Sequence, residues 1–351
     1  MPEAPGIAVG RADPLRDGPG WDAGLADFPG ATIFHTAAWA RVLHRSYGFS
    51  PAYFTARSGG SLGALLPVVE SDSWLTGRRG ISMPFTDECA PLSLDPECFQ
   101  ALYQEALRTA RLRRWKFLEL RGGRPLLGDV PTCASFLGHR LDLRPGEAAL
   151  LAGLEKSTRG AVRKAGQSGL VVTFSRDLEA VRAFHVLLVK TRKRHGVPPQ
   201  PFRFFEEIHR QILSPGRGWV ALARSGDIAV AGAVYFHHGS TVTYKYGASD
   251  SAYNHLSGNN LVTWESIRRH AAEGFETFDF GRTPLDNPGL RKFKMGWGPA
   301  EHRIEYVRHD RRSGRYAIDP GAPPRWRGRL LKALPEPLLK LIGRALYRHA
   351  A

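Results

Sequence analysis

Three basic side chains share one face of a helix predicted at residues 155–167. Arg159 and Arg163 are four residues apart, and Lys156 lies three residues before Arg159, so a helix would bring them together. Lys164 extends the same basic stretch. Guanidinium and ammonium groups in this arrangement suit a phosphate-rich ligand, such as tRNA or a nucleotide-linked precursor. The alternative is a charged helix face that contacts only water.

Carboxylates stand near the ends of two predicted strands. Asp279 ends a strand that looks buried and is followed closely by Arg282. It is placed to orient Arg282 or to accept a proton from an incoming ammonium group. A structural Asp–Arg pair is the alternative, since buried charges must be paired. Asp87 and Glu88 follow an earlier strand, where a carboxylate could act as a base or cap a helix.

The familiar signatures of several enzyme classes are absent from the sequence. There is no H-x-x-x-H pair, no G-x-S-x-G elbow and no Walker phosphate loop. The three cysteines, Cys89, Cys98 and Cys133, show no C-x-x-C spacing. The sequence therefore argues against metalloproteases, serine hydrolases and P-loop enzymes, and it predicts neither a metal site nor a disulfide framework.

The elements that must position these groups occur twice along the chain. The phrase Ala-Arg-Ser-Gly is found at residues 56–59 and 223–226, each time at the tip of a predicted β-hairpin. Each hairpin is followed by a strand-like run, a helical stretch, and a strand with an acidic residue near its end. Four matching elements in one order predict a duplicated α/β domain. Residues 1–30, rich in Gly, Pro and Asp, are predicted to be loosely ordered.

The bulk composition fits two packed domains with an anionic partner. The chain has 351 residues, 42% of them hydrophobic, and a net charge of +16. Nucleic acid, a phosphorylated substrate or an anionic membrane would suit this charge, although a genome that favours Arg explains it equally. No secretory signal pattern opens the chain, and the longest apolar run, residues 228–236, is too short to span a bilayer. We therefore expect a cytoplasmic protein.

The order of hairpin, third strand, helix and strand resembles the GNAT acyltransferase fold. Five phrases extend this to a resemblance to the FemAB/FemX-like aminoacyltransferases, over roughly residues 30–310. They are Ile33–Trp39, Ser82–Phe85, Ser157–Ala165, Phe278–Arg282 and Phe293–Gly298.

The resemblance implies two tandem GNAT-like domains of the α/β (α+β) class, with mixed, mostly antiparallel sheets flanked by helices. Residues 1–145 would form a degenerate first domain on the acceptor side. Residues 146–310 would form the second domain, on the donor side, and residues 311–351 a basic amphipathic helical tail.

The resemblance also implies roles for particular residues, most of them in the second domain. Lys294 belongs to a Phe-Lys-x-Gly-aromatic-Gly phrase that lies near the reacting groups in such enzymes, where Lys can stabilise an oxyanion or bind phosphate. The alternative is a solvated Lys on the surface. Asp279 is the second catalytic candidate, and Arg159, Arg163, Lys164, Asp87 and Arg282 would bind the acceptor or its phosphates. Donor binding is assigned to Ser257, Gly258, Asn259, Asn260 and Tyr246, of which Tyr246 is equally explained as core.

The activity implied is transfer of an acyl or aminoacyl group to an amine of a cell-envelope precursor of peptidoglycan or exopolysaccharide. The donor would be aminoacyl-tRNA or acyl-CoA, with no permanently bound cofactor and no metal. The alternatives are an acyl-CoA-dependent N-acetyltransferase acting on a small molecule or sugar, and a non-catalytic adaptor for RNA or membrane on the same scaffold.

The last segment has two helical repeats of apolar residues with basic opposite faces. Leu330, Leu331 and Leu334 recur at helical spacing, as do Leu338 and Leu341 after the Pro-Glu-Pro break. Such a basic amphipathic helix at residues 323–351 predicts peripheral contact with the inner face of the membrane. A helix that caps the fold is the alternative.

Overall fold

The chain divides into two compact units in the computed structural model, which describes residues 6–318 and 326–349. The first unit comprises Met1–Phe136, Ile304–Gly321 and Tyr347–Ala351, and the second Leu137–Arg303 and Ala322–Leu346. Two divisions fall inside strands, because β9 (Ala134–Asp142) and β15 (Ala300–Asp310) each begin in one unit and end in the other. The domain boundaries predicted at 145 and 310 lie at or after the ends of these strands, since turn residues mark where a strand stops.

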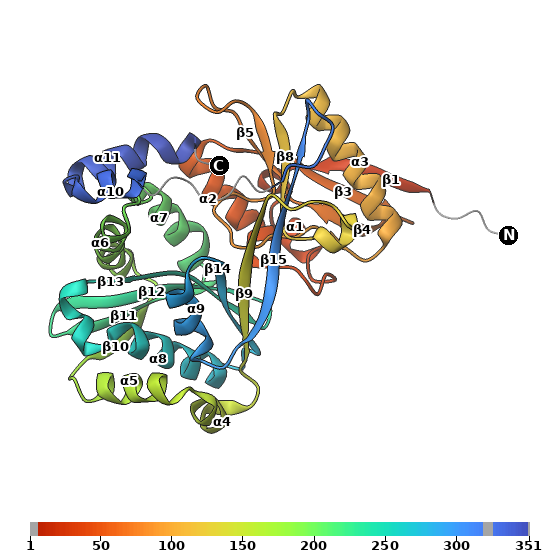
Figure 1. Cartoon of the computed structure of the whole chain (residues 1–351). Helices are drawn as coiled ribbons and strands as arrows, with labels where there is room; N and C mark the ends of the chain where they lie inside the picture. Colours follow the sequence, from red (N-terminus) through yellow and green to blue (C-terminus); the bar gives the residue numbers. More distant parts are fainter. Residues whose placement is uncertain (1–5, 319–325, 350–351) are drawn as a thin grey trace. The chain divides into compact units, whose positions relative to one another are not determined.

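The second unit contains a sheet in the strand order β10-β11-β12-β13-β14-β9-β15 (Figure 1). Its first four strands form an antiparallel meander, and β14 then runs parallel to β13 after the crossover helix α8. This is the predicted order of hairpin, third strand, helix and strand. The bounds are β10 (Val171–Ser175), β11 (Gly218–Ser225), β12 (Ile228–His238), β13 (Thr241–Ser249), α8 (Gly258–Ala272) and β14 (Thr277–Pro284).

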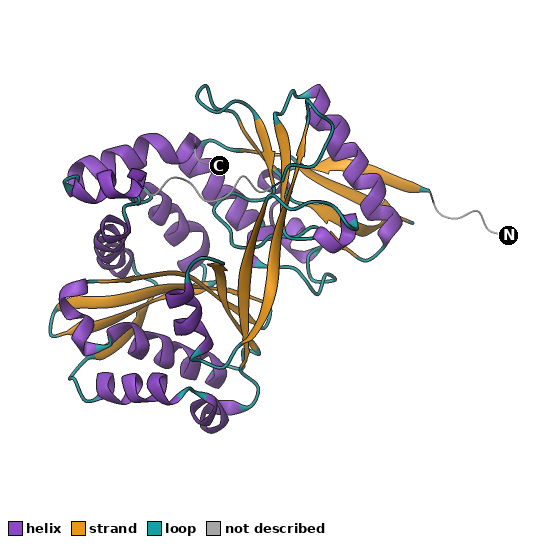
Figure 2. Cartoon of the chain, in the orientation of Figure 1, coloured by secondary structure: helices purple, strands orange, loops and turns teal. Residues whose placement is uncertain are grey.

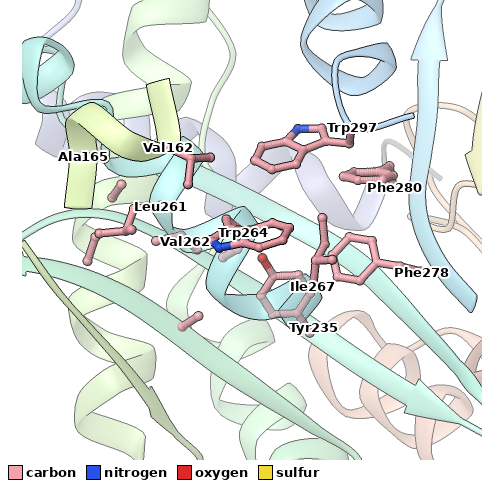
Figure 3. Packing of buried hydrophobic residues seen from close by; sticks show 14 of the residues in the cluster. Val162, Ala165, Tyr235, Leu261, Val262, Trp264, Ile267, Phe278, Phe280 and Trp297 are labelled. Atoms are coloured by element: carbon pink, nitrogen blue, oxygen red, sulfur yellow. The ribbon is translucent and has the colours of Figure 1, made fainter. Parts of the chain in front are cut away.

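Helices cover both faces of this sheet (Figure 2). On one face α8 packs against β11 and β12, with α4 and α5 packed on its outer side; on the other face α6 contacts β12 and β13. Apolar side chains between α8 and the sheet form one core, which includes Trp264, Phe278 and Trp297 (Figure 3). The remaining bounds are α4 (Gly146–Gly153), α5 (Lys156–Gly166), α6 (Leu178–His195), α7 (Phe202–Ile208), a π-helical turn (His209–Leu213), a 3-10 helix (Ser251–Leu256) and α9 (Pro288–Met295).

The first unit repeats the same plan with a break. Its strands follow the orders β1-β3-β4-β7 and β15-β8-β6-β5-β2, and β8 runs parallel to β6 after the crossover helix α3. The hairpin strand β4 stops at Pro67, which has no backbone N–H to donate, and β5 then joins the other set of strands. The bounds are β1 (Ile7–Ala12), α1 (Pro14–Ala23), α2 (Ala37–Tyr47), β2 (Ser50–Pro51), β3 (Tyr53–Ser58), β4 (Ser61–Leu66), β5 (Val69–Ser71), β6 (Arg79–Ile81), β7 (Leu92–Ser93), α3 (Pro96–Leu112) and β8 (Phe117–Arg121).

The two Ala-Arg-Ser-Gly phrases form hairpin tips with the same local geometry. Each hairpin has a register shift between the Ala and the Arg of the phrase, at Ala56/Arg57 and at Ala223/Arg224. In each copy the Arg side chain then donates to a carbonyl oxygen of its own tip. Arg57 bonds Gly60 at 3.0 Å, and Arg224 bonds Asp227 at 2.8 Å. The repeated phrase is therefore a structural turn.

The prediction of a loosely ordered N-terminus is wrong for residues 7–23. β1 pairs with β3 along its whole length, from Ile7 opposite Ser58 to Ala12 opposite Tyr53. Asp13 then caps α1 by accepting from the Leu15 backbone N–H at 3.0 Å. Strand pairing and capping outweigh the Gly and Pro content here.

The tail forms two helices, α10 (Trp326–Ala333) and α11 (Glu336–Leu346), followed by a 3-10 turn (Tyr347–His349). Both helices pack against α6 (Figure 1). Residues 323–325 and 350–351 of the predicted tail lie outside the described residues. Within the described ranges, no helix combines the length and the apolar character needed to cross a bilayer.

Candidate active site

Lys294 is a buried lysine that is held at the end of β14. Its side chain is 4% exposed, whereas the neighbouring Arg291 and Lys292 are exposed. The Lys294 Nζ atom donates to the carbonyl oxygens of Gly281 and Arg282, each at 2.9 Å. The alternative of a solvated surface lysine is therefore wrong.

The two carbonyl groups converge because the strand is irregular at Gly281. In a regular strand, successive carbonyl groups point to opposite edges. Gly281 has a φ of 67°, a conformation that glycine adopts without strain and that turns the backbone at this point. Asp279 supports the turn, because its Oδ1 atom accepts from the Gly281 backbone N–H at 2.7 Å.

The strands β13 and β14 separate just before this point. Their parallel pairing covers Thr241–Thr243 and Thr277–Asp279, although β13 continues to Ser249 and β14 to Pro284. The carbonyl groups bound by Lys294 thus belong to the part of β14 that has left β13. Backbone groups along such a splayed pair are available to a ligand, and parallel strands place their carboxyl ends at one edge of the sheet.

A second buried polar group, His139 on β9, lies beside Lys294. Its side chain is fully buried, and its Nε2 atom is 3.1 Å from the Thr283 hydroxyl oxygen. Burial, together with the positive charge of Lys294, lowers the pKa of His139 to about 4, so the ring is neutral at pH 7. The Glu301 carboxylate is 3.8 Å from His139 Nδ1 and is itself bound by Arg291 at 2.8 and 2.9 Å.

Sequence reasoning missed His139, Thr283 and Glu301. They come from three strands, and no spacing along the chain joins them. Only the pairing of β9, β14 and β15 brings them to Lys294.

The residues around Lys294 in its phrase tie α9 to the basic helix α5. A Cβ atom on Gly296 would collide with Thr158 Oγ1, and the Gly296 carbonyl oxygen accepts from the Glu155 N–H at 3.0 Å. The buried Trp297 fills the core beside Phe293, with ring centroids 6.0 Å apart. The glycine and the tryptophan of the phrase therefore serve packing, and this packing sets the position of Lys294.

Asp279 and Arg282 stand on β14 beside this lysine. Besides the hydrogen bond from Gly281 to its Oδ1 atom, Asp279 has its Oδ2 atom 3.5 Å from Arg140 Nε. Both Asp279 and Arg282 are half-buried. Asp87 belongs to the first unit, where its backbone carbonyl oxygen accepts from the Tyr306 hydroxyl at 2.6 Å.

The predicted donor turn opens α8 at the carboxyl end of β13. Ser257 takes the left-handed conformation, with a φ of 54°. Gly258 is buried: a Cβ atom there would come within 3.1 Å of Ala231 Cβ, so this glycine permits close packing on β12. Asn259 and Asn260 follow in the first turn of α8 and are half-buried. Since Ala231 pairs with Ser249, the turn lies at the same edge of the sheet as the end of β14.

Tyr246 lies in the core against α7. Its side chain is 7% exposed, and its ring centroid is 5.3 Å from that of Phe205 and 6.4 Å from that of Phe204. A register shift against β12 falls beside it, between Val234 and Tyr235. The structure thus supports the alternative that this tyrosine packs in the core.

The basic face of α5 is divided in its roles. Arg159 donates to the carbonyl oxygens of Ala152 at 2.8 Å and Leu154 at 3.0 Å, and so it caps the end of α4. The side chains of Arg163 and Lys164 are exposed and remain the candidates for binding phosphate. Among the described residues, no three His, Cys, Asp or Glu side chains gather in a way that could hold a metal ion.

Comparison with known proteins shows which domain the sequence contains and which solved structures share its fold. Residues 153–295 match the model of the acetyltransferase (GNAT) domain. The structure of FemX is similar to this chain with a TM-score of 0.66 and 15% identity, over 85% of this chain and 96% of FemX. The structure of L-PGS from Bacillus licheniformis is similar with a TM-score of 0.54 and 14% identity, over 94% of this chain and 98% of L-PGS. A tandem GNAT protein from the clavulanic acid biosynthesis pathway is similar with a TM-score of 0.54 and 12% identity, over 87% of this chain and 99% of that protein. No curated protein matches the sequence.

The protein is therefore an acyltransferase that carries a GNAT domain, and the chain as a whole has the tandem fold of FemX. The predicted resemblance to FemX-like GNAT proteins, the predicted fold class and the prediction of an enzyme are confirmed. Lys294 lies on α9 at the end of the matched domain, and its Nζ atom is bound to the open part of β14.

Proposed function

We propose that the protein transfers an acyl or aminoacyl group from aminoacyl-tRNA or acyl-CoA to an amine of a cell-envelope precursor, of peptidoglycan or exopolysaccharide. The observation that carries the proposal is the buried Lys294, fixed by two carbonyl oxygens on the part of β14 that has separated from β13. The resemblance of five phrases to the FemAB/FemX-like aminoacyltransferases supports the envelope acceptor. The net charge of +16 supports an anionic partner, and both donors are anionic.

The chemistry asks for positioning more than for a reactive side chain. The acceptor nitrogen attacks the donor carbonyl carbon, a C–N bond forms, and the bond to the tRNA oxygen or CoA sulfur breaks. The negative charge that develops on the carbonyl oxygen is stabilised by Lys294 and by backbone N–H groups near Gly258. Asp279 is the candidate to take the proton from the acceptor ammonium before the neutral amine attacks, and this proton then neutralises the leaving tRNA oxygen or CoA sulfur. Arg163 and Lys164 are candidates to bind phosphates.

The two donors remain distinct candidates. The description of the matched domain as an acetyltransferase favours acyl-CoA, whereas the likeness of the whole chain to FemX favours a transfer of the Fem type. Acetylation of a small molecule or sugar is the alternative for the acceptor, supported by the likeness to a tandem GNAT protein of a biosynthesis pathway.

The test is label transfer from acyl-CoA or charged tRNA to a panel of envelope precursors and simple amines. We expect Lys294→Met to lower kcat by about 100-fold or more, since removal of one oxyanion donor costs 10²–10³. Lys292→Met, in the same helix but exposed, is the matched control and should keep its activity. Thermal unfolding of both variants separates a loss of chemistry from a loss of folding.

Transfer by Lys294→Met at the wild-type rate would remove this residue from the mechanism. Absence of transfer from every donor, together with tight and salt-sensitive RNA binding, would favour the non-catalytic adaptor.

A further inference from the structure

The helix α11 uses one side to dock and leaves another side exposed. On the docked side, Leu339 is fully buried, and Gly343 lies against the Pro199 carbonyl oxygen so closely that no Cβ atom would fit. Pro199 belongs to the loop that follows α6, with which α11 is in contact. The tail is therefore a cap on the second unit, as one of the two alternatives predicts.

The exposed side carries leucines that the capping role does not explain. Leu338 and Leu341 are 41% and 61% exposed, and Ala345 completes the same face at a spacing of three and seven residues. Leu330 on α10 is 63% exposed. A helix that only capped the second unit would need apolar side chains on its docked side alone.

Positive charges border these leucines. Lys340 and Arg344 are exposed and one helical turn apart on α11. Burial lowers the pKa of His195 on α6, and the positive charges of Arg194, Arg192 and Lys332 lower it further, so Lys332 on α10 lies near α6. Over residues 326–349 of the sequence, Glu336 is the only acidic residue.

This combination fits one kind of partner. A second copy of the chain would bring like charges together around the leucines, and RNA would use the cations but not the apolar side chains. A surface of anionic lipid uses both, because leucines enter the interface while cations attract the headgroups. Both α10 and α11 contact α6 (Figure 1), so both helices contribute to the same region of the second unit.

We propose that the exposed face of α11, with Leu330 of α10, binds the surface of an anionic membrane while the opposite face of α11 stays docked on the second unit. The proposal concerns where the enzyme works and holds whatever the donor and acceptor are. It predicts that the tail stays folded on the protein when the membrane is absent.

The test is sedimentation of the full chain with vesicles of phosphatidylcholine alone or with about 30% phosphatidylglycerol, whose negative surface potential attracts basic side chains. We expect binding only to the anionic vesicles, weakened by salt. Lys340→Gln/Arg344→Gln should bind about twenty-five-fold more weakly, from about fivefold for each cation near the surface. Leu338→Ser/Leu341→Ser should bind roughly tenfold more weakly or worse.

Matched controls change the same residue types away from the tail. Arg311→Gln/Arg312→Gln removes two exposed charges, and Leu94→Ser/Leu112→Ser removes two exposed leucines; both should bind as the wild type does. All variants should unfold at the wild-type temperature, since the substituted side chains are exposed.

Equal vesicle binding by the tail variants and the wild type would overturn the proposal, as would no binding of the wild type. Vesicle binding that is lost in the charge variant but kept in the leucine variant would also contradict the proposal, because the leucines would then make no contribution to membrane binding. Loss of RNA binding in the charge variant, with vesicle binding unchanged, would assign the cations to RNA.

Discussion

The histidine pair in the second unit makes the stability of the protein depend on pH. The Nε2 atoms of His237 on β12 and His270 on α8 are 2.9 Å apart, and the Nδ1 atom of His270 bonds the Ser266 carbonyl oxygen at 2.6 Å. His270 therefore carries its proton on Nδ1, and its Nε2 atom accepts from His237. A proton added to His270 would occupy its Nε2 atom and place two N–H groups face to face, so the hydrogen bond between the rings needs a neutral His270. A proton added to His237 is opposed by the burial of its ring.

The magnitude follows from the pKa values. Burial, together with the positive charges of Arg176 and Arg269, lowers the pKa of His237 from 6.5 to about 3, and burial lowers that of His270 to about 4. Below pH 6.5 the unfolded chain binds protons that the folded chain does not, so stability is lost as the pH falls from 6.5 towards 4. Between pH 7 and pH 5, each of the two histidines therefore lowers the free energy of unfolding by about 2 kcal/mol.

The assay is urea unfolding at pH 7 and pH 5. The His237→Gln variant keeps an amide donor near His270 but removes one titrating group. Its free energy of unfolding should therefore fall less between pH 7 and pH 5 than that of the wild type, by about 2 kcal/mol. His255→Gln, at an exposed histidine, is the control and should lose as much as the wild type. An identical pH dependence in His237→Gln and the wild type would refute the reasoning.

Two further predictions concern packing. Gly343→Val should lower the free energy of unfolding by about 1–3 kcal/mol and expose α11 to trypsin, because the new side chain meets the Pro199 carbonyl oxygen; Ala345→Val, on the exposed side, is its control, and equal trypsin sensitivity would contradict the docking. Trp297→Ala should cost about 3–5 kcal/mol in urea unfolding, since the side chain is 1% exposed in the core, whereas Trp74→Ala, at 85% exposed, should stay within about 0.5 kcal/mol. If Trp297→Ala lowered the free energy of unfolding no more than Trp74→Ala does, Trp297 would not anchor α9.

Features set by neighbouring residues could be predicted from the sequence. Thr36 caps α2 by accepting from the Trp39 N–H at 3.4 Å, and Gly196 ends α6 with a φ of 68°. Both follow from the preference of hydroxyl side chains for helix starts and of glycine for left-handed ends. The duplicated order of elements could be read in the same way, because each hairpin signal is local.

Features that depend on distant pairing could not be predicted. β1 pairs with β3, which lies more than forty residues further along the sequence, and β1 also packs against α3. The position of Lys294 was marked by its phrase, but its burial and its neighbour His139 depend on strands brought together from far apart. Arg159 looked like a phosphate ligand because helical spacing shows which residues share a face and not which carbonyl groups lie next to it.

The matching hairpin tips also bear on how a duplicated chain avoids mispairing. Two hairpins with the same tip sequence offer strands that could pair with the wrong partner during folding, the usual hazard of repeats. In each copy the register is fixed by a shift beside the tip and by an Arg that bonds a carbonyl oxygen three residues away. Contacts of such short range close early, within microseconds for a hairpin. Each copy can therefore commit to its own partner strand before the other copy is near.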